Sequence, residues 1–343
     1  MSTESTQKWG NGLVELRPEG LYCAEGGFYI DPWKKVKRAL ITHAHSDHAR
    51  SGSEAYLTAK VGVGVLTERI GKGSPIEGIA YGESQRIGDV SVSFHPAGHV
   101  LGSGQIRIER AGRVAVVTGD YKVHADCSCH QMEPVRCDTF ITECTFGLPL
   151  FQWPDPSEVF GEMNCWWQSN RDSNRTSVMY VYSLGKAQRV LAGINSELGP
   201  IAVHRSILNL LPHYEAEGFS MPAVVPLSPE NFAQIRGSGL ILAPAAAQST
   251  NWARKVGDIS DSSASGWMQV RGMRRWNAYD RGFVLSDHVD WRGLMDTIEA
   301  TGAEHIGATH GYTSDVVKYL RETGRDAFEV PTRFTGDSLN DEA

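Results

Sequence analysis

Four side chains that can bind a metal ion lie within six residues, in the HAHSDH segment at positions 43–48. Imidazoles and carboxylates are ligands that zinc and similar divalent ions take. The segment VKRALIT at 36–42 predicts a β-strand, so His43 and His45 would point to one side, while Asp47 and His48 follow where the chain turns. One loop could therefore supply two neighbouring metal positions, the arrangement that hydrolyses phosphodiesters, amides and thioesters.

Five further polar residues follow predicted strands in the same way: His99, Asp120, Glu143, His288 and His310. Each alone could cap a helix or lie in a loop, just as a single histidine is more often an ordinary core or surface residue. Together with the 43–48 cluster they favour one shared metal or catalytic site.

The elements that position these residues predict an α/β protein. In the first half, strands are expected at 28–31, 36–42, 90–96, 105–109, 114–118 and 139–144, and a helix at 61–70. After a segment rich in proline and aromatic residues at 147–156, helices at 157–168, 186–197 and 207–217 alternate with strands at 177–182, 201–204 and 239–244. This alternation predicts a small parallel sheet, followed by a loop through residue 266. Strands at 283–285 and 305–309 and helices at 291–300 and 314–322 complete the pattern.

The composition is that of a globular protein with one large or two ordinary domains: 343 residues, 41% hydrophobic and 21% charged. No apolar stretch approaches 18 residues and the amino-terminal segment is polar, so we expect a cytoplasmic protein without a membrane span or secretory signal. A net charge of −7 argues against a protein that coats nucleic acids, but a local basic groove would still permit a nuclease.

Six cysteines suit a reducing compartment. Cys127, Cys129, His130 and Cys137 are close enough in sequence to suggest a structural zinc site. Their spacing lacks the usual pair of Cys-x-x-Cys units, so free thiols are the favoured interpretation.

The order of the first motifs resembles the metallo-β-lactamase fold: Asp31, then the 43–48 segment, then His99 and Asp120. The later motifs resemble the β-CASP nuclease branch of that fold. Its three motif positions would be Glu143 in TECTFG, His288 in SDH and His310 in THG. The strings LYCAEGGFYIDPW, TFGLPLFQWP, YSLGKAQRV and GWMQVRG to LSDHVDW are similar to the ligase-associated DNA exonucleases. The similarity runs over nearly the whole chain.

This resemblance implies an αββα sandwich built from residues 1–146 and 283–343, with a β-CASP α/β domain inserted at 147–282. It also implies two divalent metal ions, for which zinc is favoured and manganese stays open, because the same side chains bind either ion. One ion would be held by His43, His45 and His99, the other by Asp47, His48 and His310, with Asp120 bridging both.

The resemblance further assigns catalytic roles to Asp47, Asp120, Glu143 and His288. Glu143 would orient His288, whose imidazolium would neutralise the phosphate or protonate the leaving oxygen. The alternative is that His288 only caps a helix that starts near Asp290. Asp31 would orient a metal ligand, or it is a turn residue before Pro32.

Contacts to the substrate phosphates are expected from two places. Ser183 and Lys186 end a strand and open a helix, where backbone N–H groups can bind an anion, and His204 is a weaker candidate at the same edge. Arg271, Arg274 and Arg275 lie between Trp267 and Trp276, a combination that suits a single strand. The alternatives are an ordinary capped helix with a solvated lysine, and a solvated charged face.

The implied function is exonucleolytic hydrolysis of DNA, at a single strand or an exposed end, in repair alongside a DNA ligase and a helicase. An RNA-processing nuclease of the same branch is the main alternative. A small-ester or thioester hydrolase and an inactive binding module are the others. The inserted domain with Glu143 and His288 argues against the ester hydrolase, and the complete ligand set argues against the inactive module.

Overall fold

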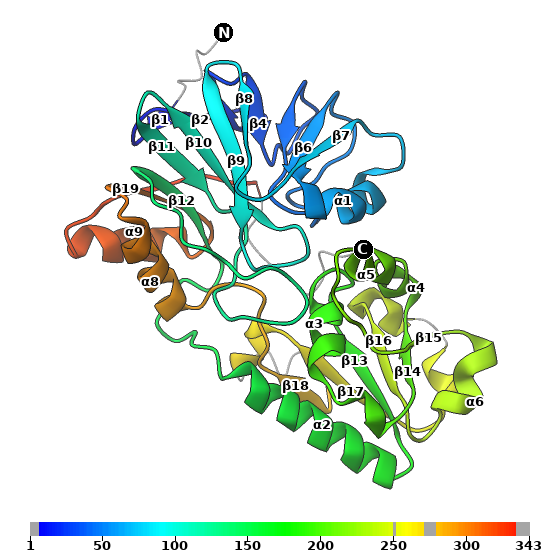
Figure 1. The fold of residues 1–343 in the computed structure, drawn as a ribbon. Helices are drawn as coiled ribbons and strands as arrows, with labels where there is room; N and C mark the ends of the chain where they lie inside the picture. The colour runs from blue at the N-terminus through cyan, green and yellow to red at the C-terminus, as the bar shows by residue number, and fades with distance from the viewer. Residues whose placement is uncertain (1–6, 250–251, 271–278, 334–343) are drawn as a thin grey trace. The chain divides into compact units, whose positions relative to one another are not determined.

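The computed structural model describes residues 7–249, 252–270 and 279–333. Contacts divide the chain into two compact units, each with helices and sheets (Figure 1). Of the described residues, unit 1 comprises 7–125, 130–152 and 288–333, and unit 2 comprises 126–129, 153–249, 252–270 and 279–287. The predicted α/β class is confirmed. The assignment of residues 147–282 to a β-CASP domain stays a prediction.

The first sheet of unit 1 contains, within the described residues, seven strands in chain order. These are β1 (Gln7–Trp9), β2 (Val14–Arg17), β3 (Gly20–Cys23), β4 (Phe28–Ile30), β5 (Ala39–Leu40), β6 (Tyr56–Ala59) and β7 (Ile76–Ile79). The strand predicted over 36–42 is wrong in extent, because β5 spans only two residues. His43 and His45 therefore lie in the turn region after β5 and not on an extended strand.

The second sheet of unit 1 has the order β20-β19-β12-β11-β10-β9-β8. Its strands are β8 (Ser84–Ile87), β9 (Val90–Pro96), β10 (Gly104–Arg110), β11 (Arg113–Val117), β12 (Thr139–Cys144), β19 (His305–Gly311) and β20 (Asp326–Glu329). The central strand β12 pairs in parallel with both β11 and β19. Sequence segments that lie on either side of unit 2 in the chain are therefore neighbours in this sheet.

Alternating side chains of this sheet enter two different cores, as the twofold periodicity of a strand requires. Val117 and Ile141 pack with Phe28 and Leu40 of the first sheet. Val116, Phe140 and Ile306 pack instead with helices α8 (Trp291–Thr301) and α9 (Thr313–Glu322). Helix α1 (Val63–Ile70) follows β6 and contacts β7. Burial on both faces explains why the predicted strands at 90–96 and 139–144 coincide with β9 and β12.

Unit 2 contains, among the residues described for it, a six-stranded parallel sheet of order β15-β14-β16-β13-β17-β18. The strands are β13 (Thr176–Tyr180), β14 (Ile201–Val203), β15 (Val225–Pro226), β16 (Leu240–Ala243), β17 (Ile259–Ala264) and β18 (Arg281–Phe283). The helices are α2 (Pro156–Asp172), α3 (Lys186–Gly193), α4 (Arg205–Leu208), α5 (Leu211–Ala216) and α6 (Phe232–Ile235). Apolar cores lie on both faces of the sheet.

Three sequence predictions for unit 2 need correction. Strand β17 lies inside the predicted loop through residue 266, because its sequence ISDSSA is too small and polar to predict a strand. The helix predicted over 207–217 is two short helices, α4 and α5. The helix predicted over 186–197 ends at Gly193. Among the described residues, no helix is long and apolar enough to cross a membrane.

Candidate metal centre

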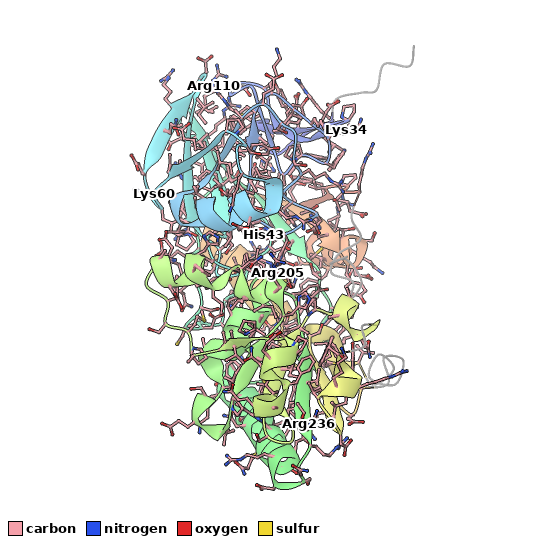
Figure 2. The ribbon with its side chains drawn as sticks, turned by 90° about the vertical axis from the view of Figure 1, so that its right-hand side faces the viewer. Lys34, His43, Lys60, Arg110, Arg205 and Arg236 are labelled. Carbon is pink, nitrogen blue, oxygen red and sulfur yellow. The ribbon has the colours of Figure 1, made fainter. Side chains whose placement is uncertain are left out.

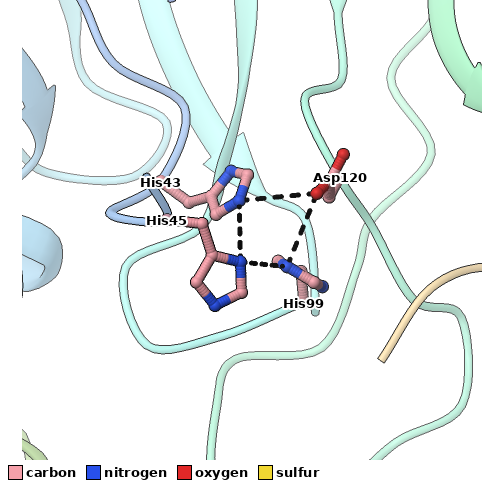
Figure 3. Close-up of side chains that lie close together, drawn as sticks. All are labelled: His43, His45, His99 and Asp120. Carbon is pink, nitrogen blue, oxygen red and sulfur yellow. Dashed lines mark hydrogen bonds and ion pairs between the residues drawn. The ribbon is translucent and has the colours of Figure 1, made fainter. Parts of the chain in front are cut away.

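Unit 1 brings together His43, His45, His99 and Asp120, with one ligand atom of each within 4.8 Å of the others (Figure 3). Nδ1 of His45 lies 3.2 Å from Nε2 of His43 and 3.0 Å from Nε2 of His99. Oδ2 of Asp120 lies 3.5 Å from Nε2 of His43 and 3.7 Å from Nε2 of His99. Three imidazole nitrogens and a carboxylate oxygen converge, which is a donor set that zinc takes.

A second group consists of Asp47, His48 and His310, whose ligand atoms also lie within 4.8 Å of one another. Nε2 of His48 lies 3.4 Å from Oδ2 of Asp47 and 3.5 Å from Oδ1 of Asp120. The rings of His48 and His310 stack at 5.0 Å. Asp120 therefore presents one oxygen to each group, so its carboxylate could serve as a ligand to two metal ions.

Two buried polar atoms of this region lack a hydrogen-bond partner in the part of the chain that is described: Nε2 of His48 and Oδ1 of Asp120. Leaving such atoms unsatisfied in a dry interior costs free energy. A cation held by both groups would satisfy them, so the residues present fit the two divalent ions that the sequence resemblance implies.

The conformation of His48 is fixed by Asp31, which follows β4 and has a φ of 42°. Oδ2 of Asp31 lies 2.7 Å from Nδ1 of His48 and accepts a hydrogen bond from Oγ1 of Thr42 at 2.6 Å. Oδ1 accepts from the backbone N–H of Thr42 at 2.8 Å. With its Nδ1–H donated to Asp31, His48 keeps the lone pair of Nε2 for a metal. The sequence did not identify Thr42 as a partner of Asp31, although its position directly before His43 places it next to the ligand cluster.

We predict that Asp31→Asn weakens divalent metal binding by about 10- to 100-fold, because the amide is a poorer acceptor for His48 than the carboxylate. Titration of metal-free protein with Zn²⁺ and with Mn²⁺ measures the change. Asp89→Asn, at an exposed surface ion pair, is the matched control. Unchanged metal affinity in Asp31→Asn would show that Asp31 is only a turn residue.

A third group consists of Asp120, Glu143 and His288. Nδ1 of His288 lies 3.0 and 2.9 Å from the two carboxylate oxygens of Glu143, and 4.0 Å from Oδ2 of Asp120. Oε1 of Glu143 also accepts from the backbone N–H of Tyr121 at 2.8 Å. Helix α8 is capped by Asp290, whose side chain accepts from the N–H of Gly293, so His288 is not the capping residue.

The electrostatics of the buried groups prepare these residues for a metal. Burial alone would lower the pKa of His48, but the carboxylates of Asp120 and Asp47 outweigh it and hold that pKa well above its usual value. Burial would raise the pKa of Asp120, but His48 and His288 hold it well below its usual range. Burial, reinforced by His48, lowers the pKa of His43. Ionised Asp120 and neutral His43 are the forms that bind metals, whereas His48 must release a proton when an ion binds to it.

The residues predicted to contact the substrate phosphates have partners inside unit 2 or lie outside the described residues. Lys186 is buried and its ammonium lies 2.8 Å from Oδ2 of Asp287 inside unit 2, so it is not a solvated lysine, and its contact with a substrate phosphate stays a prediction. Oγ of Ser183 lies 2.7 Å from Oγ of Ser206, and Nδ1 of His204 accepts from the N–H of Ser206 at the start of α4. The arginines predicted to contact the strand lie outside the described residues: Arg271, Arg274 and Arg275.

The cysteines take no part in the three ligand groups found among the described residues. Cys127 and Cys165 are exposed, whereas burial raises the pKa of Cys137 to about 12 and that of Cys23 to about 11. At pH 8 a thiol with a pKa near 12 is ionised to only about one part in 10⁴.

We therefore predict that iodoacetamide at pH 8 modifies Cys127 and Cys165 in the folded protein, while Cys23 and Cys137 react only after denaturation. Peptide mass spectrometry checks this, and rapid modification of Cys137 would contradict its burial.

Comparison with known proteins finds no matching family model. A "Probable DNA ligase" from Opitutus terrae is 28% identical over 314 residues, which are 91% of this chain and 30% of that protein. "Endoribonuclease ysh-1" from Neurospora crassa is 32% identical over 133 residues, 38% of this chain and 15% of that protein. "RNase aCSPSF2" from Saccharolobus solfataricus is 24% identical over 243 residues, 59% of this chain and 48% of that protein. The chain thus spans less than half the length of these relatives.

Among solved structures, a protein of unknown function from Enterococcus faecalis V583 has a similar fold, with a TM-score of 0.59 and 13% sequence identity. The match covers 88% of this chain and 80% of that protein. At this identity the likeness concerns the fold alone.

Proposed function

We propose that this chain, a relative of the β-CASP metallo-β-lactamase nucleases, hydrolyses phosphodiester bonds at DNA ends with two divalent metal ions. The names of the curated relatives confirm the family resemblance that the motifs predicted. They support a metal-dependent nuclease, and the choice between DNA and RNA belongs to the proposal.

The observation that carries the proposal is Asp120, whose two oxygens each lie 3.5 Å from a histidine of a different ligand group. In the proposed site, His43, His45 and His99 hold one ion, and Asp47, His48 and His310 hold the other. When bound, the two ions activate a water molecule and polarise the scissile phosphate. Zinc suits the histidine-rich first group, and manganese stays the alternative.

The residues of the third group supply the proton chemistry. Glu143 holds Nδ1 of His288, and the proposed task of this imidazole is to donate a proton to the leaving oxygen or to neutralise the phosphate. Thioester hydrolysis has less need of such an acid, because a thiolate leaves more readily without a proton than the alkoxide of a phosphodiester does.

Two observations favour nucleic acid, and DNA in particular. Unit 1 exposes a basic segment before β5, in which Lys34, Lys35, Lys37 and Arg38 lie at the surface, whereas His43 is buried (Figure 2). Such local positive charge can attract a phosphate backbone to a protein of net charge −7. The relative named as a DNA ligase matches 91% of this chain, against 38% for the one named as an endoribonuclease. The same match supports a DNA ligase as functional partner in repair.

The test is digestion of matched DNA and RNA strands, labelled at either the 5′ or the 3′ end, as single strands and duplexes. We expect shortening of DNA from one end in Zn²⁺ or Mn²⁺ and none in EDTA. A strong preference for the RNA strands would replace the proposal with the second candidate, an RNA-processing nuclease, which the 32% identity to the endoribonuclease supports. Hydrolysis of thioesters without cleavage of either strand would overturn both.

A further inference from the structure

Helix α3 carries two buried cations one turn apart, Lys186 and Arg189, and both bind the segment that ends at Asp287. Nζ of Lys186 donates to the carbonyl of Leu285 at 2.7 Å and lies 2.8 Å from Oδ2 of Asp287. Nη1 of Arg189 donates to the carbonyl of Ser286 at 2.5 Å and to Oδ1 of Asp287 at 2.9 Å. Three successive residues are thus held by two side chains of one helix.

Stability alone does not explain this cluster. The side chains of Lys186, Arg189 and Asp287 are 4%, 2% and 8% exposed. Moving ionised groups out of water costs several kcal/mol for each, which their mutual attraction repays only in part, and well-packed apolar side chains are often as stable. What the ion pairs add is direction, because both carboxylate oxygens of Asp287 and the carbonyls of Leu285 and Ser286 face defined donors on α3.

Arg189 also holds a second segment of unit 2. Its Nε lies 3.4 Å from Oδ2 of Asp126, and Oδ1 of Asp126 accepts from the N–H and the hydroxyl of Ser128, each at 2.6 Å. Asp126 and Asp287 are positions at which the chain passes between the two units. One guanidinium therefore hydrogen-bonds the residue before His288 and forms an ion pair with Asp126, a residue six positions after Asp120.

His288 is the next residue after this fixed segment. On its other side, Asp290 caps α8 and holds the N–H of Gly293 at 2.8 Å. We propose that Lys186 and Arg189 are positioning residues that hold the backbone before His288, so that its ring keeps the contact with Glu143. The effect of these residues on catalysis rests on the proposed nuclease function. Their hydrogen bonds and ion pairs to residues 285–287 do not depend on that function.

The kinetic test uses Lys186→Met and Arg189→Met in the full chain loaded with metal. Each variant lowers kcat by about 10- to 100-fold, the usual cost of losing an orienting partner, with KM changed less than about twofold. In a His288→Asn background the same substitutions cause no further loss, because the side chain that they position is already absent. Arg189→Lys, which keeps the charge, recovers part of the rate. Lys72→Met, at a lysine with an 84% exposed side chain, is the control for loss of a lysine.

A raised KM with unchanged kcat would overturn the proposal and assign Lys186 to substrate phosphate. Losses that multiply with that of His288→Asn would also overturn it. Amide hydrogen exchange of residues 284–290 gives a readout that needs no activity. We expect exchange to be faster in Arg189→Met than in the wild type. Unchanged protection would show that Arg189 does not restrain this segment and would overturn the proposal. If Arg189→Met does not fold, Asp287→Asn removes the shared charge and takes its place in both measurements. Absence of cleavage by the wild type would count against the nuclease function alone. The exchange result would still decide whether Arg189 restrains the backbone before His288.

Discussion

Asp120→Ala is expected to abolish cleavage of a labelled oligonucleotide, with a loss on the order of a thousandfold or more. Asp120 is the residue whose two oxygens face both ligand groups, at 3.5 Å from His43 and 3.5 Å from His48. Its removal takes a negative charge from both metal positions. Bound ions stabilise the charge of the transition state and lower the activation free energy by several kcal/mol. Metal analysis of the purified variant should show less than two ions per chain.

Asp120→Asn separates charge from shape, since the amide keeps the size of the side chain but is a poorer bridge. Asp296→Ala, on the exposed face of α8, is the control and should cleave at the wild-type rate. Far-ultraviolet circular dichroism and thermal melting report whether the fold persists. Cleavage at the wild-type rate by folded Asp120→Ala would exclude the two-metal mechanism.

Glu143→Gln is expected to lower kcat by about 10²- to 10⁴-fold while the protein retains both metal ions. That range is the usual contribution of a positioned acid, and the amide of glutamine cannot stabilise a protonated His288 as the carboxylate does. Glu143 is fully buried at the end of β12 and bonded to His288 through Nδ1. Single-turnover kinetics with metal-saturated enzyme measure the chemical step directly.

His288→Asn should cost about as much as Glu143→Gln, and the double variant little more than either, because residues that act as a unit are not additive. If the two losses multiplied, the residues would have independent tasks. If Glu143→Gln released metal instead, the third group would be a metal position and not an acid pair.

The sequence predicted the ligand set better than the path of the chain around it. The metal-binding types of the 43–48 segment, His99, Asp120 and His310 were visible because polar residues interrupt apolar runs at strand ends. The structure brings them together as expected, although His43 and His45 do so from a turn and not from a strand. Whether they bind metal is the prediction that Asp120→Ala and metal titration test.

The missed strand β17 and the unforeseen burial of Lys186 share a physical cause. Strand β17 is held by its neighbours β13 and β18 and not by its own propensity, so its small polar residues gave no signal. A solvated Lys186 was a reasonable alternative because its partner, Asp287, lies about a hundred residues later in the sequence. Long-range ion pairs leave no periodic trace, and only the folded chain reveals them.

The parallel pairing of β12 with β19 has a consequence for the timing of activity. The first ligand group is complete by residue 120, yet His288 and His310 arrive only after the chain has returned from unit 2. Until β19 is in place, β12 has an open edge, and before residue 288 has been added Glu143 has no imidazole to orient. A nascent or truncated chain thus holds a metal-binding motif without an acid, so the proposed enzyme acquires the means to cut DNA only after the segment through His310 has been made and folded.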